Sequence, residues 1–516
     1  MSSVLNSAQS AHSTQSDPLY RQLAKKLEAA IASGTLGEGD RMPSVRTLSL
    51  QHGVSISTAI AVYRELENMR LVEARPKSGY FVVPRGVPGL PVRLGNKLAK
   101  PRFMDVPTPA TPTPLVIGPA SFVHISQQTD AMMSLSQSSC RIRLDTCRLT
   151  GVYPVQKVQR LMNTVARRQP GLLIQEAVTA GHPVLRAELA KRALLMGVPL
   201  SPDDILITNG VTEALNLALR AVAKPGDTIA VESPTFFGIL QILESLGMKA
   251  LEIPTHARDG LSIEALGLAI HQAQEQGQPI KALVVMSNFH NPQGSLMPDD
   301  NKARLVRLMH NHHIPIIEDD WSGDLYFTEG RPQSLKAWDT GNQVILCSSA
   351  TKPIAPGLRI GWMAGGQWQA QLERLKYTTS IANIALPQVT IAEFIKTGGY
   401  EHHLRKLRGL FHTQTRRMAA AIERYFPEGT QFVTPQGGAL LWVELPQGAS
   451  GQLMSSRQLF EMARAEGIGI GPGTLFSNSQ RFGHYIRIYC GGVWDFDLDA
   501  TIQKLGILVY ALQQRS

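Results

Sequence analysis

The chain has 516 residues, of which 43% are hydrophobic and 18% charged, and a formal net charge of +10. This length exceeds that of one ordinary domain and indicates two or three globular domains with a large buried core. The polar N-terminus lacks the apolar core of a signal peptide, no run of 18 apolar residues follows, and the four cysteines form no CxxC pair. These features argue against secretion, a membrane span, a disulfide framework and a metal site, and they predict a cytoplasmic protein.

The N-terminal third of the chain divides into three parts by composition. Residues 1–16 are polar and low in complexity, which predicts a disordered tail. Residues 17–83 have the pattern of a small domain with helices and a hairpin. Residues 84–139 are predicted to be a linker, because the stretch 84–119 holds nine prolines in 36 residues.

The remainder of the chain, residues 140–516, has the pattern of an α/β domain. Short apolar runs such as TIAVE (228–232) and ALVVM (282–286) alternate with helical stretches. This alternation is typical of βαβ units and predicts a mostly parallel central sheet. The pattern loosens after about residue 400, which indicates a smaller C-terminal α+β subdomain.

The small N-terminal domain is basic. Between residues 18 and 102 there are 14 Lys and Arg against 6 Asp and Glu, and such a compact excess of positive charge favours a polyanion, most often nucleic acid. One amphipathic helix is predicted to end near Gly34, and two more are joined by a tight turn at Gly53 and Val54. The stretch RLVEARPKSGYFVVP then predicts two short strands around a basic turn, which is the order of a helix-turn-helix followed by a wing.

Residues 18–83 resemble the GntR type of winged helix-turn-helix, whose pattern PLYxQL…LPSxR…GVSxxT…LE…GxGxF they match almost continuously. The resemblance implies binding to double-stranded DNA, with hydroxyls and backbone N–H groups at helix starts and cations on either side. The predicted DNA contacts are Ser44, Arg46, Ser55, Ser57, Thr58, Lys77 and Gly79. Ile56 stands where the family often has an arginine, so one expected contact is missing. An ordinary three-helix domain with a solvated basic face is the alternative.

In the large domain, the stretch SSATKPIAPGLRIGW places Lys352 seven residues before Arg359. Pro353 biases Lys352 towards extended backbone that can present its side chain, although lysine in a proline-rich loop is common. The stretch resembles the SxxKxxxxPGxRxGW motif of fold-type I pyridoxal 5'-phosphate enzymes, in which the lysine forms a Schiff base with the cofactor. By this resemblance Ser349 and Arg359 bind the cofactor phosphate, a task that suits the planar guanidinium.

Four further segments match the same enzymes in the expected order. ILITNGVTEALNLAL predicts a strand, a tight turn and a helix, where the backbone N–H groups of Gly210, Val211 and Thr212 face the phosphate. The other three segments are VESPTFFG, SNFHNPQG and IPIIEDDWSGDL. By resemblance Phe236 stacks on the pyridine ring, Asn291 binds the phenolic oxygen, and Asp319 pairs with the pyridinium nitrogen so that the ring acts as an electron sink.

Arg487, in RFGHYIRIYCGG, lies on a predicted strand where the family binds the substrate carboxylate, although a lone strand arginine is more often a surface ion pair. Three residues after Asp319, relatives usually carry a tyrosine near the cofactor oxygen. This chain has Ser322 there, with Trp321 beside it. Because the loss of this tyrosine weakens the groups that tune the electronic properties of the pyridine ring, we expect the site to bind an amino compound rather than to turn it over.

A GntR-type winged helix, a linker and an aminotransferase-like domain, in this order, resemble the MocR family of bacterial transcriptional regulators. The resemblance implies a head-to-tail homodimer that binds operator DNA, senses an amino compound or pyridoxal 5'-phosphate, and controls transcription of metabolic genes. Two alternatives stay open. One is a catalytically active aminotransferase with an accessory DNA-binding domain, and the other is a regulator whose site has lost the cofactor and binds another ligand.

Overall fold

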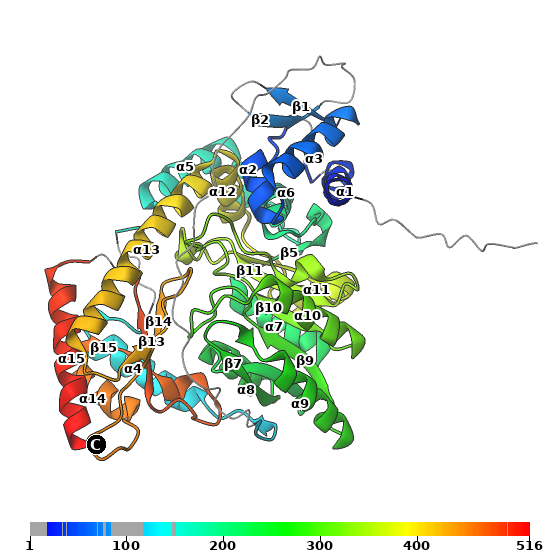
Figure 1. Ribbon diagram of the computed structural model, residues 1–516. Helices are drawn as coiled ribbons and strands as arrows, with labels where there is room; N and C mark the ends of the chain where they lie inside the picture. The colour runs from blue at the N-terminus through cyan, green and yellow to red at the C-terminus, as the bar shows by residue number, and fades with distance from the viewer. Residues whose placement is uncertain are drawn as a thin grey trace, which may run out of the picture. The chain divides into compact units, whose positions relative to one another are not determined.

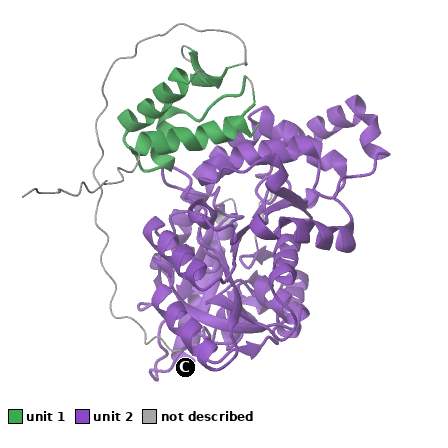
Figure 2. Ribbon diagram, turned by 90° about the vertical axis from the view of Figure 1, so that its right-hand side faces the viewer, with its two compact units in different colours: residues 1–100 green, residues 101–516 purple. Residues whose placement is uncertain are grey.

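The computed structural model describes residues 18–33, 35–37, 39–69, 71–75, 79–83, 117–146, 151–492 and 494–516. The predicted tail 1–16, Lys77 and the most proline-rich part of the linker lie outside these residues. The chain forms two compact units, residues 1–100 and residues 101–516 (Figure 2). No helix in the described part of the chain is both long and apolar enough to cross a membrane.

The first unit is a three-helix domain with a two-stranded wing. Its elements are α1 (Leu19–Ala32), α2 (Val45–Gln51), α3 (Ile56–Asn68), β1 (Val72–Arg75) and β2 (Gly79–Val82). Ser44 and Ser55 immediately precede α2 and α3, and each serine side chain accepts a hydrogen bond from the backbone N–H three residues later at 3.0 Å. Serine is favoured at this position because its oxygen satisfies a helix N–H that has no other acceptor.

One face of each helix builds the core of this unit. Leu23 and Leu27 of α1 are buried, as are Val62 and Leu66 of α3, and the two helices pack together. Tyr63 of α3 stacks on a tyrosine of the wing, with 4.3 Å between ring centroids. The wing is therefore fixed to α3, which is the second helix of the predicted helix-turn-helix.

The second unit is built on a nine-stranded sheet in the order β3-β7-β6-β9-β10-β11-β12-β5, with β8 paired to β7. Figure 1 labels β5, β7, β9, β10 and β11 of this sheet. Strands β7, β6, β9, β10 and β11 are parallel, whereas β3 and β12 run antiparallel to their neighbours. The strands are β3 (Ser121–Phe122), β5 (Ile205–Thr208), β6 (Thr228–Ser233), β7 (Lys249–His256), β8 (Gly260–Leu261), β9 (Ile280–Val285), β10 (Ile316–Asp319), β11 (Val344–Ser349) and β12 (Gly361–Ala364). The predicted mostly parallel central sheet is confirmed.

Helices cover both faces of this sheet, because alternate residues of a strand point to opposite faces. Ile229 and Val231 of β6 belong to the core cluster that includes α7 and α8, whereas Ala230 belongs to the cluster that includes α9 and α10. The helices of this part are α5 (Val155–Arg168), α6 (Pro183–Ala193), α7 (Val211–Val222), α8 (Phe237–Ser245), α9 (Ile263–Glu275), α10 (Asp299–Asn311), α11 (Gln369–Ser380) and α12 (Ala385–Lys396). Single 3-10 turns are η1 (Pro170–Leu173), η2 (Leu194–Met196), η3 (Pro202–Asp204), η4 (Leu335–Trp338), η5 (Pro356–Leu358) and η6 (Gly366–Trp368).

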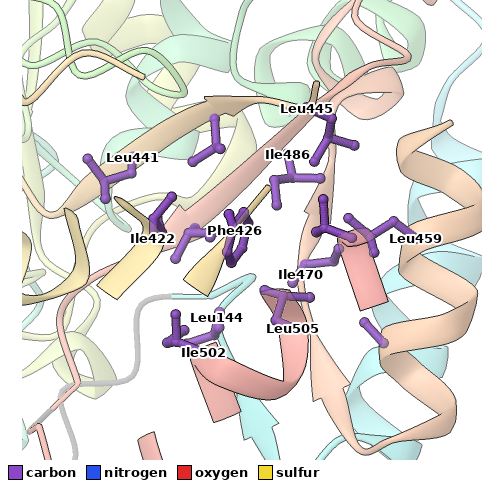
Figure 3. Close-up of a cluster of buried hydrophobic side chains, with 14 of the residues drawn as sticks. Leu144, Ile422, Phe426, Leu441, Leu445, Leu459, Ile470, Ile486, Ile502 and Leu505 are labelled. Atoms are coloured by element: carbon purple, nitrogen blue, oxygen red, sulfur yellow. The ribbon is translucent and has the colours of Figure 1, made fainter. Parts of the chain in front are cut away.

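A smaller α+β part follows, as expected from about residue 400. It contains α13 (Gly399–Tyr425), α14 (Ser456–Ala465), η7 (Gly473–Phe476) and α15 (Phe496–Arg515), and a four-stranded antiparallel sheet of β13 (Gln431–Phe432), β14 (Leu440–Glu444), β17 (Tyr485–Tyr489) and β16 (Gly471–Pro472). Figure 3 shows its core, where Leu441 and Ile486 of the sheet lie among Ile422, Leu459 and Leu505 of the helices.

The predicted linker boundary is wrong at its C-terminal end. Residues 121–139 form β3, which pairs with β7, and α4 (Ser126–Ser139), which packs against α8 and α14. The following strand β4 (Ile142–Arg143) pairs with β15 (Ile468–Gly469). The smaller α+β part therefore takes in α4 and β4, which come before all strands of the central sheet except β3 in sequence.

Candidate functional site

The predicted cofactor residues gather at one edge of the central sheet. Asp319 ends β10 and Ser349 ends β11, and these strands are parallel. Strand β5 pairs with β12 and β12 with β11, both antiparallel, so β5 ends at the same edge and presents Gly210 there. Ligands of open α/β sheets bind outside the carboxyl ends of the strands. The sheet topology thus brings Gly210, Asp319 and Ser349, which are far apart in sequence, to the same edge of the sheet.

Lys352 lies over the indole ring of Trp321, with 3.5 Å from Nζ to the ring centroid. Ser349 Oγ accepts the backbone N–H of Lys352 at 3.1 Å, which fixes the start of the lysine loop. The aromatic face attracts a cation through its quadrupole. Trp321 is a site residue whose role sequence reasoning missed, although its position two residues after Asp319 was a signal.

Asp319 is fully buried beside Lys352 and accepts the backbone N–H of Trp321 at 3.3 Å. Burial raises the pKa of Asp319 to about 7, and the positive charge of Lys352 opposes this rise. A carboxylate in this position needs a nearby cation to stay ionised at neutral pH. A protonated ring nitrogen fits that requirement.

The two carboxylates that flank Asp319 have structural partners. Glu318 accepts hydrogen bonds from the hydroxyl of Ser287 and the backbone N–H of Leu335, each at 2.8 Å. Asp320 forms an ion pair with Arg331 at 2.6 Å. Because strand residues alternate between faces, only the middle carboxylate of the three is left for the cofactor edge.

The turn after β5 forms a tight cradle beside Arg359. Gly210 has φ = 80°, and a Cβ atom added to it would lie 2.8 Å from Nη2 of Arg359. Arg359 donates to the backbone carbonyl of Asn209 at 3.2 Å. The N–H of Gly210 donates to the carbonyl of Thr208 at 2.9 Å, so Val211 and Thr212, in the first turn of α7, are the better phosphate donors.

Arg487 and Asn291 are in direct contact. Nη1 of Arg487 donates to Oδ1 of Asn291 at 3.0 Å, and Nη2 donates to the carbonyl of Asp145. Since its oxygen accepts from Arg487, the amide N–H₂ of Asn291 can donate to another group. Arg487 is 5% exposed and lies 4.8 Å from the ring centroid of Phe476, so it is no surface ion pair.

Phe236 and Ser322 are the remaining predicted cofactor residues, and they lie before α8 and after β10 respectively. Phe236 immediately precedes α8, is half-buried, and its ring centroid lies 4.6 Å from that of Phe237. Ser322 is buried and donates its hydroxyl to the carbonyl of Asn288 at 2.9 Å. A serine has one O–H proton, so this geometry does not support Ser322 as a donor to the cofactor oxygen.

The winged helix presents the other predicted site. Ser55 Oγ caps α3 and also contacts the hydroxyls of Ser57 and Thr58 at 2.6 and 2.8 Å. Arg46 is exposed in the first turn of α2, and Gly79 has φ = 102° at the start of β2. A Cβ atom on Gly79 would lie 3.6 Å from Nε of Arg41. Arg41, an exposed cation beside the wing, was missed by sequence reasoning.

Comparison with known proteins decides the family. Residues 19–82 match the gntR family of bacterial regulatory proteins, and residues 150–505 match aminotransferase class I and II. The chain is 35% identical to the uncharacterized HTH-type transcriptional regulator YjiR of Escherichia coli, over 95% of this chain and 98% of that protein. It is 33% identical to YdcR of the same organism, over the same shares of both chains. The chain belongs to the MocR family.

As a MocR protein it is a DNA-binding transcriptional regulator with an aminotransferase-like domain whose cofactor is pyridoxal phosphate. The fold agrees with solved structures. The kynurenine aminotransferase of Pyrococcus horikoshii is 26% identical, with a TM-score of 0.69 over 74% of this chain and 94% of that chain. A multiple substrate aminotransferase from Thermococcus profundus is 24% identical, with a TM-score of 0.70 over 76% and 96%. The second likeness supports the fold alone.

The residues gathered at this sheet edge fit pyridoxal phosphate. A lysine lies next to a buried carboxylate, and a glycine turn backed by an arginine stands at the same sheet edge. The groups match an aldehyde, a ring nitrogen and a phosphate respectively. No group of three or more His, Cys, Asp or Glu that could hold a metal occurs among the residues that the structure describes.

Proposed function

We propose that the large domain senses an amino compound that carries a carboxylate, and that this binding changes how the winged helices engage DNA. The observation that carries the proposal is the buried Arg487, held against Asn291. Arginine binds carboxylates through two parallel hydrogen bonds. A chain of contacts runs from Lys352 through Trp321 and its neighbour Ser322 to the loop of Asn288 and Asn291.

Each residue of the site has a defined task in this proposal. Pyridoxal phosphate supplies a ring that withdraws electron density from an attached amino compound. Lys352 would hold its aldehyde carbon, Asp319 its ring nitrogen, Asn291 its phenolic oxygen and Phe236 its face. Its phosphate would be held by Arg359, Ser349 and the N–H groups of Val211 and Thr212. Arg487 binds the carboxylate of the effector, and Trp321 holds the ammonium group of Lys352 before the cofactor binds.

A catalytically active aminotransferase is the second candidate function. The simultaneous presence of Lys352, Asp319 and Arg487 favours it, because these groups suffice to bind an amino acid on the cofactor. Against it, Ser322 stands at the tyrosine position and uses its hydroxyl proton on a backbone carbonyl. Release of keto acid from added amino acids separates the two functions.

We also propose that the large domains form a head-to-tail homodimer. Leu173 and Ile174 follow one another at the end of η1, and Ile384 immediately precedes α12, which packs against η1. Ile174 is 87% exposed and Ile384 is 76% exposed. Exposed apolar side chains of this kind favour burial against a second copy. Ile384→Glu should convert the dimer to a monomer in sedimentation analysis, whereas an unchanged dimer would contradict this interface.

For the winged helix, we propose that Arg46 and Lys77 bind phosphates, and that Ser44, Ser55, Ser57, Thr58 and the backbone at Gly79 bring α2, α3 and the wing against DNA. Arg46→Ala should weaken binding to all duplexes and reduce the slope of log affinity against log salt by about one. Retention of the full slope would contradict a phosphate contact.

One experiment tests the sensing function. Full-length protein is mixed with pyridoxal phosphate, and the visible absorption band is followed in wild type, Lys352→Ala and a control, Lys396→Ala, which changes an exposed lysine of α12. We expect loss of the band only in Lys352→Ala. Amino acids are then titrated while DNA affinity is measured by fluorescence anisotropy. A compound that changes both the spectrum and DNA affinity supports the proposal, and spectral change with unchanged DNA affinity contradicts it.

A further inference from the structure

The start of α3 carries an apolar side chain that does not join the core. Ile56 is the first residue of the helix and is 55% exposed. Ile60 lies one turn later on the same side and is half-buried. The residues that pack the helix into the domain are Ala59, Val62, Tyr63 and Leu66. The domain therefore keeps a branched apolar side chain at the surface that its own packing does not require.

The neighbours of Ile56 are small and hydroxylated. Ser55 and Ser57 flank it, both exposed, and Ser55 Oγ is engaged by the N–H of Thr58. The first turn of α3 contains no acidic residue. In a helix-turn-helix, the N-terminal residues of the second helix contact base edges in the major groove. An isoleucine there cannot read a base through hydrogen bonds.

The chemistry open to an apolar side chain in the major groove is contact with a methyl group. Thymine alone among the four bases presents one, on C5, and the other three present only donors and acceptors there. We propose that Ile56, with Ile60 beside it, reads the C5-methyl group of a thymine in each operator half-site. The inference rests on DNA binding by the winged helix and, for the two half-sites, on the proposed homodimer, and it adds the base that α3 selects.

The test uses the full-length chain and synthetic duplexes. A duplex that the wild type prefers is selected from a random pool, and each thymine is then replaced singly by deoxyuridine, which lacks only the methyl group. Affinity is measured by fluorescence anisotropy for wild type, Ile56→Ala and Ile56→Val. At one thymine in each half-site, we expect deoxyuridine to weaken wild-type binding about fourfold, the value for one buried methyl group.

The variants make the assignment specific to Ile56. Ile56→Ala should be insensitive to deoxyuridine at that position, and Ile56→Val, which keeps the branched carbon, should retain part of the effect. The salt dependence should stay that of wild type in both, because no phosphate contact is removed. Thermal unfolding should also be unchanged, since the side chain is largely exposed.

Three results would overturn the inference. If no deoxyuridine substitution weakens wild type, or if every one weakens wild type and Ile56→Ala equally, Ile56 reads no thymine, although the protein still binds DNA. If the wild type retains no duplex from the pool at all, DNA binding itself fails and the inference fails with it. The two failures are distinguished by whether any duplex is bound.

Discussion

Arg487 holds the amide oxygen of Asn291 at 3.0 Å and at the same time donates to the backbone carbonyl of Asp145. The three residues come from β17, from the loop after β9 and from the segment after β4. One guanidinium thus joins the small C-terminal sheet to the edge of the central sheet. Its removal affects both the proposed carboxylate contact and the side chain predicted to bind the cofactor oxygen.

We expect Arg487→Leu to weaken binding of amino acids about 30-fold or more, because truncating one member of a buried charged pair costs at least about 2 kcal/mol. Amines without a carboxylate should lose much less. Spectral titration of the bound cofactor measures both. The control is Arg481→Leu, an exposed arginine that precedes the same strand. Equal losses for amino acids and simple amines would contradict a carboxylate contact.

Trp321→Leu should increase affinity for pyridoxal phosphate at neutral pH. The indole face stabilises the ammonium form of Lys352, whereas the neutral amine is the form that attacks the aldehyde. A cation–π contact of about 0.5–2 kcal/mol corresponds to a gain of about 2- to 30-fold. Trp321→Phe keeps a ring face and should show a smaller gain. Weaker binding in both variants would indicate that the ring packs on the cofactor instead.

The sequence predicted the central sheet and the strand-end residues well, for a physical reason. Gly210, Asp319 and Lys352 each follow a short apolar run, and the carboxyl ends of parallel strands meet at one edge. Their position at one edge therefore follows from the local pattern, whereas their order along that edge, with β5 beyond β12, does not. The contact of Arg487 with Asp145 spans 342 positions and joins two sheets. No local pattern in the sequence could therefore predict it.

The segment 121–139, by contrast, was wrongly predicted to belong to the linker. Its helix α4 is rich in serine and glutamine, and Met132 is its only buried hydrophobic residue, beside Thr129 and Ser136. Ser136 donates to Asp145, which is also paired with Arg143. A helix held by polar contacts lacks the apolar stripe that predicts a helix from sequence, and the prolines before it favoured the linker interpretation.

Asp319→Asn should change how stability depends on pH in protein freed of cofactor. The folded-state pKa of Asp319 is raised from 3.8 to about 7. Between about pH 4 and pH 7 the folded protein therefore retains a proton that the unfolded chain has released, so the contribution of this group to stability falls as pH rises. Asparagine removes this contribution.

Thermal unfolding from pH 5 to pH 8 measures the effect. The melting temperature of wild type minus that of Asp319→Asn should be greatest at pH 5 and should decrease towards pH 8. Asp300→Asn changes an exposed carboxylate of α10 and is the matched control. A difference that stays constant across this range would contradict the raised pKa.

The close approach of β12 to the phosphate turn gives the last prediction. A Cβ atom on Gly361 would lie 2.4 Å from the carbonyl carbon of Gly210, so Gly361→Ala must push the turn away from Arg359. We expect a loss of about 1–3 kcal/mol in the free energy of unfolding, as for other overpacked sites. Pyridoxal phosphate should lose more affinity than pyridoxal, which lacks the phosphate. Gly357→Ala, where an added Cβ meets no atom within 4 Å, should behave as wild type in both measurements. Equal losses of affinity for pyridoxal phosphate and pyridoxal would show that the phosphate does not bind at this turn.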